Sequence, residues 1–238
     1  MRKILINYAD KKFFQSQLEN CESATSIAGF DETIPYGIDM INEDFINDNN
    51  KIMSSERGAG YWLWKPYIIN EQFKLHNEGD IVMYSDSGAV FVRHIQPLFN
   101  AIAEEPLGII AFSLAGRHFE RQYNRKRVIE SFDLDIETIS TTSQLMASFI
   151  MFRICEESRK IIEYWLNKCV QPDLIMDKPT KDPDEFPEFI DHRHDQALWS
   201  LTAKKFGLSV YRDPTQWGLH HGESEAKDFF INHHRNKI

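Results

Sequence analysis

The chain has 238 residues, of which 42% are hydrophobic and 13% aromatic, and its formal net charge is −9 at pH 7. This composition can build a packed core, which excludes an intrinsically disordered chain. The acidic balance excludes a broad nucleic-acid interface, which needs a clustered basic surface. No run of about 18 apolar residues is present, so no membrane span is predicted.

The N-terminal segment and the cysteines both predict a cytoplasmic protein. The first apolar stretch, within Lys3–Tyr8, is shorter than the roughly 7–15 apolar residues of a secretory signal. Cys21, Cys155 and Cys169 are odd in number, lie far apart and form no CxxC pair. This usage is typical of a reduced, cytoplasmic chain.

A short buried strand is predicted at Lys3–Tyr8, followed by a helix whose apolar positions include Phe14 and Leu18. A strand that leads directly into a helix is typical of the start of a nucleotide-binding α/β domain, where ligands lie beyond the carboxyl ends of the strands. Tyr8 and Asp10 would then face the ligand, and the alternative for Asp10 is a helix N-cap. No GxGxxG follows, so the dinucleotide fingerprint is absent.

The most distinctive segment is Arg57–Tyr67, RGAGYWLWKPY. Its glycines permit backbone angles or close approaches that a side chain would block. Arg57 and Lys65, with the N–H groups of a helix start, are suited to binding a phosphate or diphosphate. Tyr61 and Trp64 are suited to stacking on a base or a sugar ring. In the alternative, the aromatic residues belong to the core and the two cations are solvated.

The next strand ends in a carboxylate. Ile81–Tyr84 is apolar throughout, which predicts a central strand covered on both faces, and it runs into Asp86. A carboxylate at the carboxyl end of a buried strand commonly holds a metal or a ribose. The alternative is a turn aspartate with a local hydrogen-bonding role.

The order of a first strand, RGxGYWxWKPY, a strand ending in YSDSG and a later DQ pair resembles a family of small bacterial and viral glycosyltransferases of the GT-A type. The resemblance runs through most of the chain. It implies one α/β domain over residues 1–238, with a central mixed sheet flanked by helices. It also implies transfer of a sugar from a nucleotide-sugar donor to a glycan or lipid-linked acceptor in surface polysaccharide assembly.

The same resemblance implies a divalent cation, Mn²⁺ or Mg²⁺, on the donor diphosphate. Asp86 matches the first Asp of the DxD motif, but Gly88 occupies the second Asp position. This departure argues against tight metal binding, because a hard cation takes several oxygen ligands. A terminal histidine that returns to the metal is matched by His234, with His233 or His221 as substitutes.

The DQ pair at a helix start, Asp195 and Gln196, would face the donor sugar and the acceptor. Asp195 and Asp86 are the predicted catalytic residues. Asp195 would be the general base of an inverting transfer, or would steady the oxocarbenium-like state of a retaining one; a plain N-cap is the alternative. The predicted donor-binding residues are Tyr8, Asp10, Arg57, Tyr61, Trp64, Lys65, Asp86, Ser87, Gly88, Gln144, His194, Gln196, His234 and Arg235.

Two further segments are predicted to be loops. Arg117–Arg127 is rich in arginine, and it is either a solvated loop or a contact for a diphosphate, an anionic acceptor or the inner face of a membrane. Gln171–Glu188 contains four prolines and is long enough for a functional lid or a mobile surface.

Two other functions remain open from the sequence. His192, His194 and Asp195 form an HxHD run that could serve a metal-dependent hydrolase, because HxH brings two imidazoles close together in an extended chain. Gly88 in place of an acid also favours a non-catalytic module that binds a sugar nucleotide.

Overall fold

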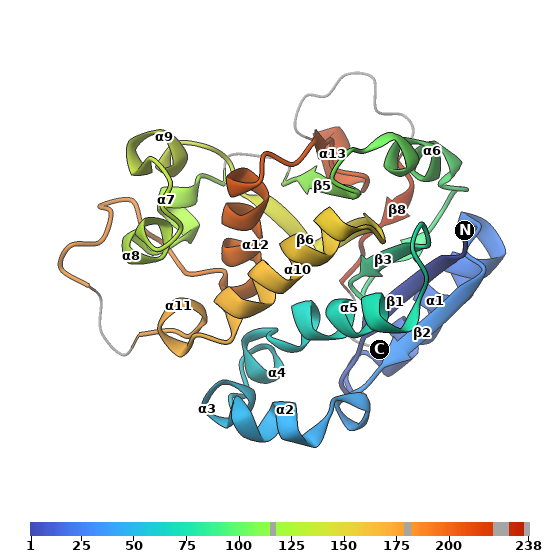
Figure 1. Cartoon of the computed structure of the whole chain (residues 1–238), viewed down its shortest axis with the longest axis horizontal. Coiled ribbons are helices and arrows are strands. Elements are labelled where there is room, and N and C mark those ends of the chain that lie inside the picture. The colour runs from blue at the N-terminus through green and yellow to red at the C-terminus, as the bar shows by residue number, and fades with distance from the viewer. Residues whose placement is uncertain (115–117, 179–181, 221–228, 236–238) are drawn as a thin grey trace.

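A six-stranded sheet in the order β2-β1-β3-β6-β5-β7 forms the centre of the molecule (Figure 1). The computed structural model describes residues 1–114, 118–178, 182–220 and 229–235. Arg117 and His221 therefore lie outside the described residues. The strands are β1 (Lys3–Tyr8), β2 (Glu32–Tyr36), β3 (Ile81–Ser85), β5 (Ile109–Ser113), β6 (Leu145–Arg153) and β7 (Val210–Tyr211).

The sheet is mixed because one strand, β6, runs against its neighbours. β1 pairs in parallel with β2 and β3, whereas β6 pairs antiparallel with both β3 and β5. The carboxyl ends of β1, β3 and β5 consequently meet at one edge of the sheet. β3 is buried along its whole length between β1 and β6, as its apolar sequence predicts.

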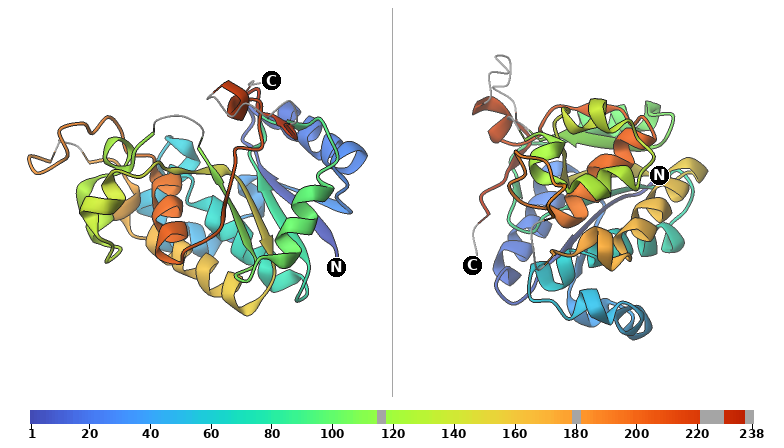
Figure 2. Two further views of the ribbon diagram at one scale, coloured as in Figure 1. Left: turned by 90° about the horizontal axis from the view of Figure 1, so that it is seen from above. Right: turned by 90° about the vertical axis from the view of Figure 1, so that its left-hand side faces the viewer.

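Helices cover both faces of the sheet, as the two further views show (Figure 2). One face carries α5 (Trp64–Leu75), α10 (Glu156–Cys169) and α12 (His194–Lys205); the other carries α1 (Phe14–Ser23), a π-helical turn η1 (Ala24–Ala28) and α6 (Gln96–Glu104). The remaining helices are η2 (Ile38–Met40), α2 (Glu43–Asp48), α3 (Asn50–Met53), α4 (Gly58–Tyr61), α7 (Glu120–Tyr123), α8 (Lys126–Glu130), α9 (Ile136–Ser140), α11 (Pro172–Ile175) and α13 (Trp217–His220). The predicted central mixed sheet flanked by helices is confirmed.

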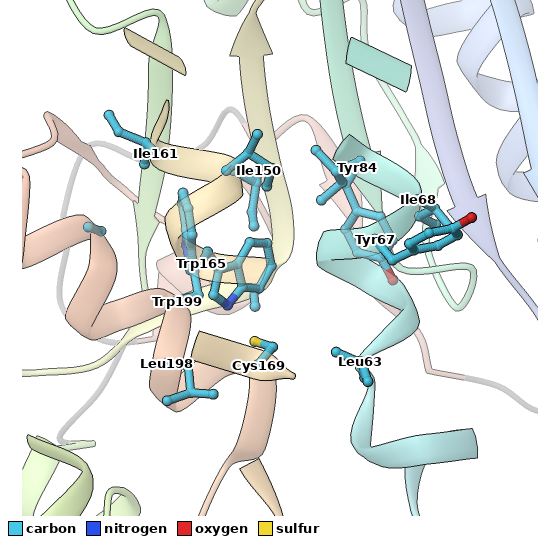
Figure 3. Packing of buried hydrophobic residues seen from close by; sticks show 14 of the residues in the cluster. Leu63, Tyr67, Ile68, Tyr84, Ile150, Ile161, Trp165, Cys169, Leu198 and Trp199 are labelled. Carbon is cyan, nitrogen blue, oxygen red and sulfur yellow. The ribbon is translucent and has the colours of Figure 1, made fainter. Parts of the chain in front are cut away.

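Aromatic side chains fill the larger core between the sheet and α5, α10 and α12 (Figure 3). Trp165 of α10 and Trp199 of α12 are fully buried, with ring centroids 4.9 Å apart. They pack beside Tyr84 of β3 and Ile150 of β6. Burying an aromatic side chain of this size stabilises the fold by roughly 2–3 kcal/mol, so this cluster holds α12 firmly against the sheet.

The helix after β1 exposes two of its apolar residues and buries polar ones. Phe14 is 59% exposed and Leu18 44%, whereas Gln17 and Asn20 are buried. The reason is a polar network beneath α1, in which the Asn7 amide of β1 donates to Asn20 (2.7 Å) and the Gln17 amide donates to Asn7 (3.0 Å). Hydrogen bonds inside this network satisfy the buried polar groups.

The C-terminal segment returns to the middle of the chain. β8 (Ile231–Asn232) pairs antiparallel with β4 (Val90–Phe91), and this places residues 233–235 beside the end of β3. No helix of the described residues is long and apolar enough to cross a membrane.

The two segments predicted as loops are more ordered than expected. Within the described residues, 118–127 contribute α7 and the start of α8, and 171–178 contain α11. Arg125 is buried and donates to the carbonyls of Asp173 and Leu174, which join the two segments. Burying an arginine requires such partners, so Arg125 is not part of a solvated loop, whereas the Arg127 side chain is 43% exposed.

Candidate functional site

Two adjoining hollows lie at the edge of the sheet where β1 and β3 end. We call the first, of about 490 Å³, the β1 pocket, because Tyr8, Asp10 and Ser87 line it. The second, of about 540 Å³, is the α12 pocket, lined by Asp195, Gln196 and other residues near the start of α12. The shared wall is formed by Trp62, Asp86, Ser148, His233 and Arg235. Paired hollows with a common wall suit a reaction between two substrates.

The β1 pocket has an aromatic floor. The rings of Tyr8 and Trp64 are stacked with centroids 3.9 Å apart, and the Ser87 hydroxyl donates to the Tyr8 carbonyl (2.6 Å). Asp10 lines the same hollow and accepts from the Lys12 N–H, while the N-cap of α1 is Phe13, so the N-cap alternative for Asp10 is wrong. An aromatic face beside a carboxylate suits a base and the hydroxyls of a ribose.

The glycines of the distinctive segment permit a left-handed turn. Gly58 has φ +60° and Gly60 φ +97°, and a Cβ on Gly60 would come within 2.9 Å of the Met53 Cα. This turn directs Trp62 into the wall between the pockets, where its ring stacks on His194 at 5.6 Å. The sequence motif is therefore explained by backbone geometry as well as by chemistry.

Lys65 does not face an open diphosphate site as expected. It is 4% exposed, and its Nζ lies 2.7 Å from Asp195 Oδ2, 3.7 Å from Asp86 Oδ1 and 3.1 Å from the Ala147 carbonyl, to which it donates. Burial alone would lower the pKa of Lys65, but the charges of Asp195 and Asp86 raise it above its ordinary value. Lys65 therefore remains a cation that links the two predicted catalytic carboxylates.

The two carboxylates have different environments. Burial raises the pKa of Asp195 to about 6, against the opposing effect of Lys65. Asp86 is more exposed, and its Oδ1 accepts from the Tyr84 hydroxyl (2.7 Å). A carboxylate with a pKa near the working pH is suited to accepting a proton, whereas Asp86 is placed to contact a ligand in either pocket.

Gln144 acts behind the site, not in its lining. It is fully buried and its amide donates to the buried carboxylate of Glu120 (3.1 Å), while its oxygen accepts from Gln196 (3.1 Å). The Gln196 oxygen in turn accepts from the Ala147 N–H (3.4 Å). This network orients the Gln196 side chain, which does line the α12 pocket.

His192 and His194 anchor the segment before α12. Their ring nitrogens lie 2.8 Å from the Leu174 carbonyl and 2.7 Å from the Ile175 carbonyl, respectively. Burial lowers the pKa of both rings below the ordinary histidine value. Both histidines are thus neutral, and their rings contact carbonyls of α11. These two hydrogen bonds give the HxH spacing a structural role that needs no metal.

The C-terminal segment explains why Gly88 replaces the second acid. A Cβ on Gly88 would meet the Arg235 Cα at 3.0 Å, and the Arg235 N–H donates to the Gly88 carbonyl (2.8 Å). Backbone from the C-terminus thus occupies the place of a longer side chain. Of the candidate histidines, His233 lines both pockets, whereas His234 is not part of either lining.

The ligands for a divalent cation are few. Among the described residues, no group of three or more His, Cys, Asp or Glu side chains is placed to hold a metal. Asp86 and His233 both lie in the shared wall, and burial lowers the pKa of His233 to about 4, so its imidazole is neutral and able to ligate. A carboxylate with an imidazole fits a transition-metal cation such as Mn²⁺ better than Mg²⁺, which takes oxygen ligands, and the remaining ligands would come from phosphates and water.

Most of the predicted site residues come together, and a few do not. Tyr61 is buried against the His194 ring at 4.8 Å and, like Gln144 and His234, is not in the lining of either pocket. Arg57 lines the α12 pocket and is held by Asp177 and Asp191. The predicted donor-binding and catalytic residues that do line a pocket are Tyr8, Asp10, Arg57, Trp64, Lys65, Asp86, Ser87, Gly88, His194, Asp195, Gln196 and Arg235.

Several lining residues are not among those predicted from the sequence. Trp62 lies inside the distinctive motif, and Arg193 lies between the two histidines of the HxH run, so proximity to those motifs was an available signal. Ser148, Asp213 and Trp217 reach the site from other elements, and their local sequence has no spacing that indicates a site.

No protein-family model matches the chain, and no curated protein matches it in sequence. Among solved structures, the crystal structure of mouse xyloside xylosyltransferase 1 in its apo form is similar, with a TM-score of 0.52 and 10% sequence identity. The similarity covers 98% of this chain and 96% of that chain. At this identity the likeness is one of fold, and it confirms a GT-A-like, glycosyltransferase-like fold for this chain.

Proposed function

We propose that the protein is a glycosyltransferase that moves a sugar from a nucleotide-sugar donor to a hydroxyl of a glycan or lipid-linked acceptor in surface polysaccharide assembly. The observation that carries this proposal is the pair of hollows that share Asp86, His233 and Arg235, with Asp195 on the α12 side. The GT-A-like fold supports it at the level of fold alone.

In this proposal the β1 pocket takes the nucleoside of the donor. The stacked Tyr8 and Trp64 face the base, and Asp10 accepts hydrogen bonds from the ribose hydroxyls. The diphosphate lies at the shared wall, where the Arg235 guanidinium offsets the charge that develops on the leaving group. A divalent cation held by Asp86 and His233 would supply further charge neutralisation there.

Asp195 accepts the proton of the attacking hydroxyl. The acceptor O–H bond breaks, the acceptor oxygen bonds to the anomeric carbon, and the bond from that carbon to the diphosphate oxygen breaks. Lys65 holds the Asp195 carboxylate in place, and the Gln144–Gln196 hydrogen bond orients an amide beside it. The α12 pocket thus holds the acceptor against the donor sugar.

The test is a thermal-shift screen of nucleotide-sugars with and without Mn²⁺, followed by a transfer assay with each ligand that binds. A specific ligand at a hundredfold excess over its Kd stabilises the folded state by about 2.7 kcal/mol. Asp10→Asn and Asp86→Asn should reduce the shift, while Asp48→Asn on the exposed surface of α2 should not.

Three results would contradict the proposal. A screen without any shift would refute donor binding. Donor binding without turnover on any acceptor would favour the non-catalytic sugar-nucleotide module. Metal-dependent hydrolysis of a phosphoester that survives Asp86→Ala would favour the hydrolase based on His192, His194 and Asp195.

A further inference from the structure

The cations that line the α12 pocket are of two kinds. Lys65 and Arg57 are neutralised inside the protein: Lys65 by Asp195 and Asp86, and Arg57 by Asp177 and Asp191 at 3.4 and 3.0 Å. Arg193 and Arg235 line the same pocket, and neither makes an ion pair with a carboxylate of the described residues. The pocket therefore presents two guanidinium groups that form no salt bridge within the described part of the chain.

The carboxylates of the α12 pocket are already engaged elsewhere. Asp86 and Asp195 face Lys65, and Asp191 faces Arg57 through both oxygens, at 3.0 and 3.3 Å. Asp213 accepts from the backbone N–H and the hydroxyl of Thr215, at 2.8 and 2.7 Å. Among the described residues none of these acids forms a salt bridge with Arg193 or with the exposed Arg235, although the charge of Asp191 also acts on Arg193. Both guanidinium groups therefore keep donors for a ligand.

Arg193 is held in position by groups on α7. Its guanidinium lies 3.7 Å from the centre of the Tyr123 ring, and its backbone N–H donates to the Tyr123 carbonyl (3.1 Å). Burial lowers the pKa of Arg193, Tyr123 and Asp191 oppose this effect, and the charge of Arg235 adds to it. An anion bound near both guanidinium groups would reduce the repulsion between them, which suits this part of the pocket to an acidic ligand.

We infer that the acceptor carries an acidic group, a carboxylate or a phosphate, which binds at Arg193 with Arg235 opposite. This inference rests on the proposed function. Arg193 lines only the α12 pocket, whereas Arg235 lines both pockets. A variant of Arg193 therefore tests binding of the acceptor separately from binding of the donor diphosphate. The indole of Trp217, which is 45% exposed in the same pocket, offers a face for the acceptor sugar ring.

The test measures binding of matched sugars to the full chain by titration calorimetry or ligand-observed NMR. The probes are methyl glucuronide, its neutral counterpart methyl glucoside, and methyl glucoside 6-phosphate, so that the carboxylate and phosphate are separate arms. Wild type should bind at least one acidic sugar about tenfold more tightly than the neutral one, the gain expected for a charge-assisted hydrogen bond.

Variants assign that preference to the site. Arg193→Gln should abolish the preference for the acidic sugar, and Arg193→Lys should retain part of it because the charge remains without the two-pronged geometry. Arg127→Gln is the matched control, since Arg127 lies on α8 opposite Asp173, outside both pockets. If Arg193→Gln does not fold, the preference for the acidic sugar is compared between Arg193→Lys and wild type, and it should be weaker in the variant.

Several outcomes would overturn the inference. Equal binding of the glucuronide, the glucoside and the phosphate would remove the anion site, and so would a preference that survives Arg193→Gln. Loss of nucleotide-sugar binding in Arg193→Gln would assign the arginine to the donor. The protein could also prefer the acidic sugar through Arg193 and yet bind no nucleotide-sugar. That result would refute the proposed transferase function, and with it the role of the acidic sugar as an acceptor.

Discussion

At the scale of single residues, Lys65 has the greatest influence on the site. The sequence suggested a cation for the diphosphate, but the structure places the ammonium in the core, where it links Asp195 to Asp86. A buried ion pair contributes little when intact, because burial of both charges costs about as much as their attraction gains. Its removal is costly, since the remaining partner is left as an uncompensated buried charge.

Lys65→Met should lower the free energy of unfolding by about 3 kcal/mol. The cause is the Asp195 carboxylate, which is 4% exposed and would have lost the ammonium 2.7 Å away. Urea denaturation near pH 7.5 measures the change, and the double variant Lys65→Met/Asp195→Asn should recover part of it. Lys74→Met, which removes an exposed ion pair to Glu71, should cost less than about 1 kcal/mol. Strict additivity of the two core substitutions would show that the pair is not coupled.

Asp195 should make stability depend on pH in the direction opposite to an ordinary surface carboxylate. Burial raises its folded pKa from 3.8 to about 6, so the folded state binds the proton more tightly than the unfolded state. The resulting stabilisation is present below about pH 3.8 and is lost as the pH rises to about 6, with an upper limit of about 3 kcal/mol. Comparing the unfolding free energy of wild type and Asp195→Asn from pH 4 to 7.5 isolates this contribution.

The rate of transfer should also depend on the ionisation of Asp195, but it should rise with pH where the stabilisation falls. A general base must be ionised, so the rate should rise through about pH 6 and level off above it. Asp195→Asn should lose the activity, and an unchanged rate profile in that variant would contradict the assigned role. A transfer rate that is already flat at pH 5 would show that another group accepts the proton.

At the scale of the elements, α1 shows how tertiary contacts can reverse the face that a helix buries. Asn20 accepts from the Asn7 amide of β1 (2.7 Å) and donates to the Ser85 hydroxyl of β3 (3.1 Å) and the Ala89 carbonyl (2.9 Å). These partners come from three separate segments of the sheet edge. The polar face of α1 therefore ties the ends of β1 and β3 together, directly behind Asp86.

Asn20→Ala should lower the free energy of unfolding by about 3 kcal/mol, because it leaves the Ala89 carbonyl buried without its partner and leaves the Asn7 amide only the Cys21 sulfur, at 3.3 Å. Phe14→Ser on the opposite face of the same helix should change it by less than about 0.5 kcal/mol, since Phe14 is 59% exposed. Chemical denaturation of both variants measures the contrast. If Phe14→Ser were the more damaging change, the assignment of the inner face would be wrong.

At the scale of the whole molecule, the site depends on segments from both ends of the chain. Tyr8 comes from the first strand, Asp86 from the third, Asp195 from α12 and Arg235 from the C-terminal segment. The pairing of β4 with β8 brings Arg235 to Gly88 and completes the wall between the pockets. Both pockets thus depend on segments from the two halves of the chain.

Gly88→Ala should displace the C-terminal segment and weaken nucleotide-sugar binding. Its new Cβ would lie 3.0 Å from the Arg235 Cα, and overpacking of this kind costs about 1–3 kcal/mol. Thermal shifts with and without the nucleotide-sugar measure stability and affinity together. Gly37→Ala is the control, because its Cβ would meet the movable end of the Asp39 side chain. An unchanged affinity in Gly88→Ala would exclude a role for this contact in donor binding.

The local pattern of residues determined much of the fold and the place of the site. The apolar run of Ile81–Tyr84 predicted a central strand, and the strand-to-helix start predicted ligands at the carboxyl edge, because backbone geometry links these patterns to burial. Asp86 and Asp195 both line the α12 pocket, because Asp86 follows β3 and Asp195 lies in the first turn of α12, and both of these ends face that edge.

Only the tertiary structure decided which polar groups are buried and which hydrogen-bond or ion-pair partners they have. Lys65 and Arg193 are both cations beside a recognisable motif, yet one is neutralised in the core and the other has no carboxylate partner among the described residues. Asn20 is buried because its partners arrive from β1 and β3. Periodicity along a chain predicts which face of an element is buried. The partners that offset the desolvation cost of a buried charge or amide come from distant segments.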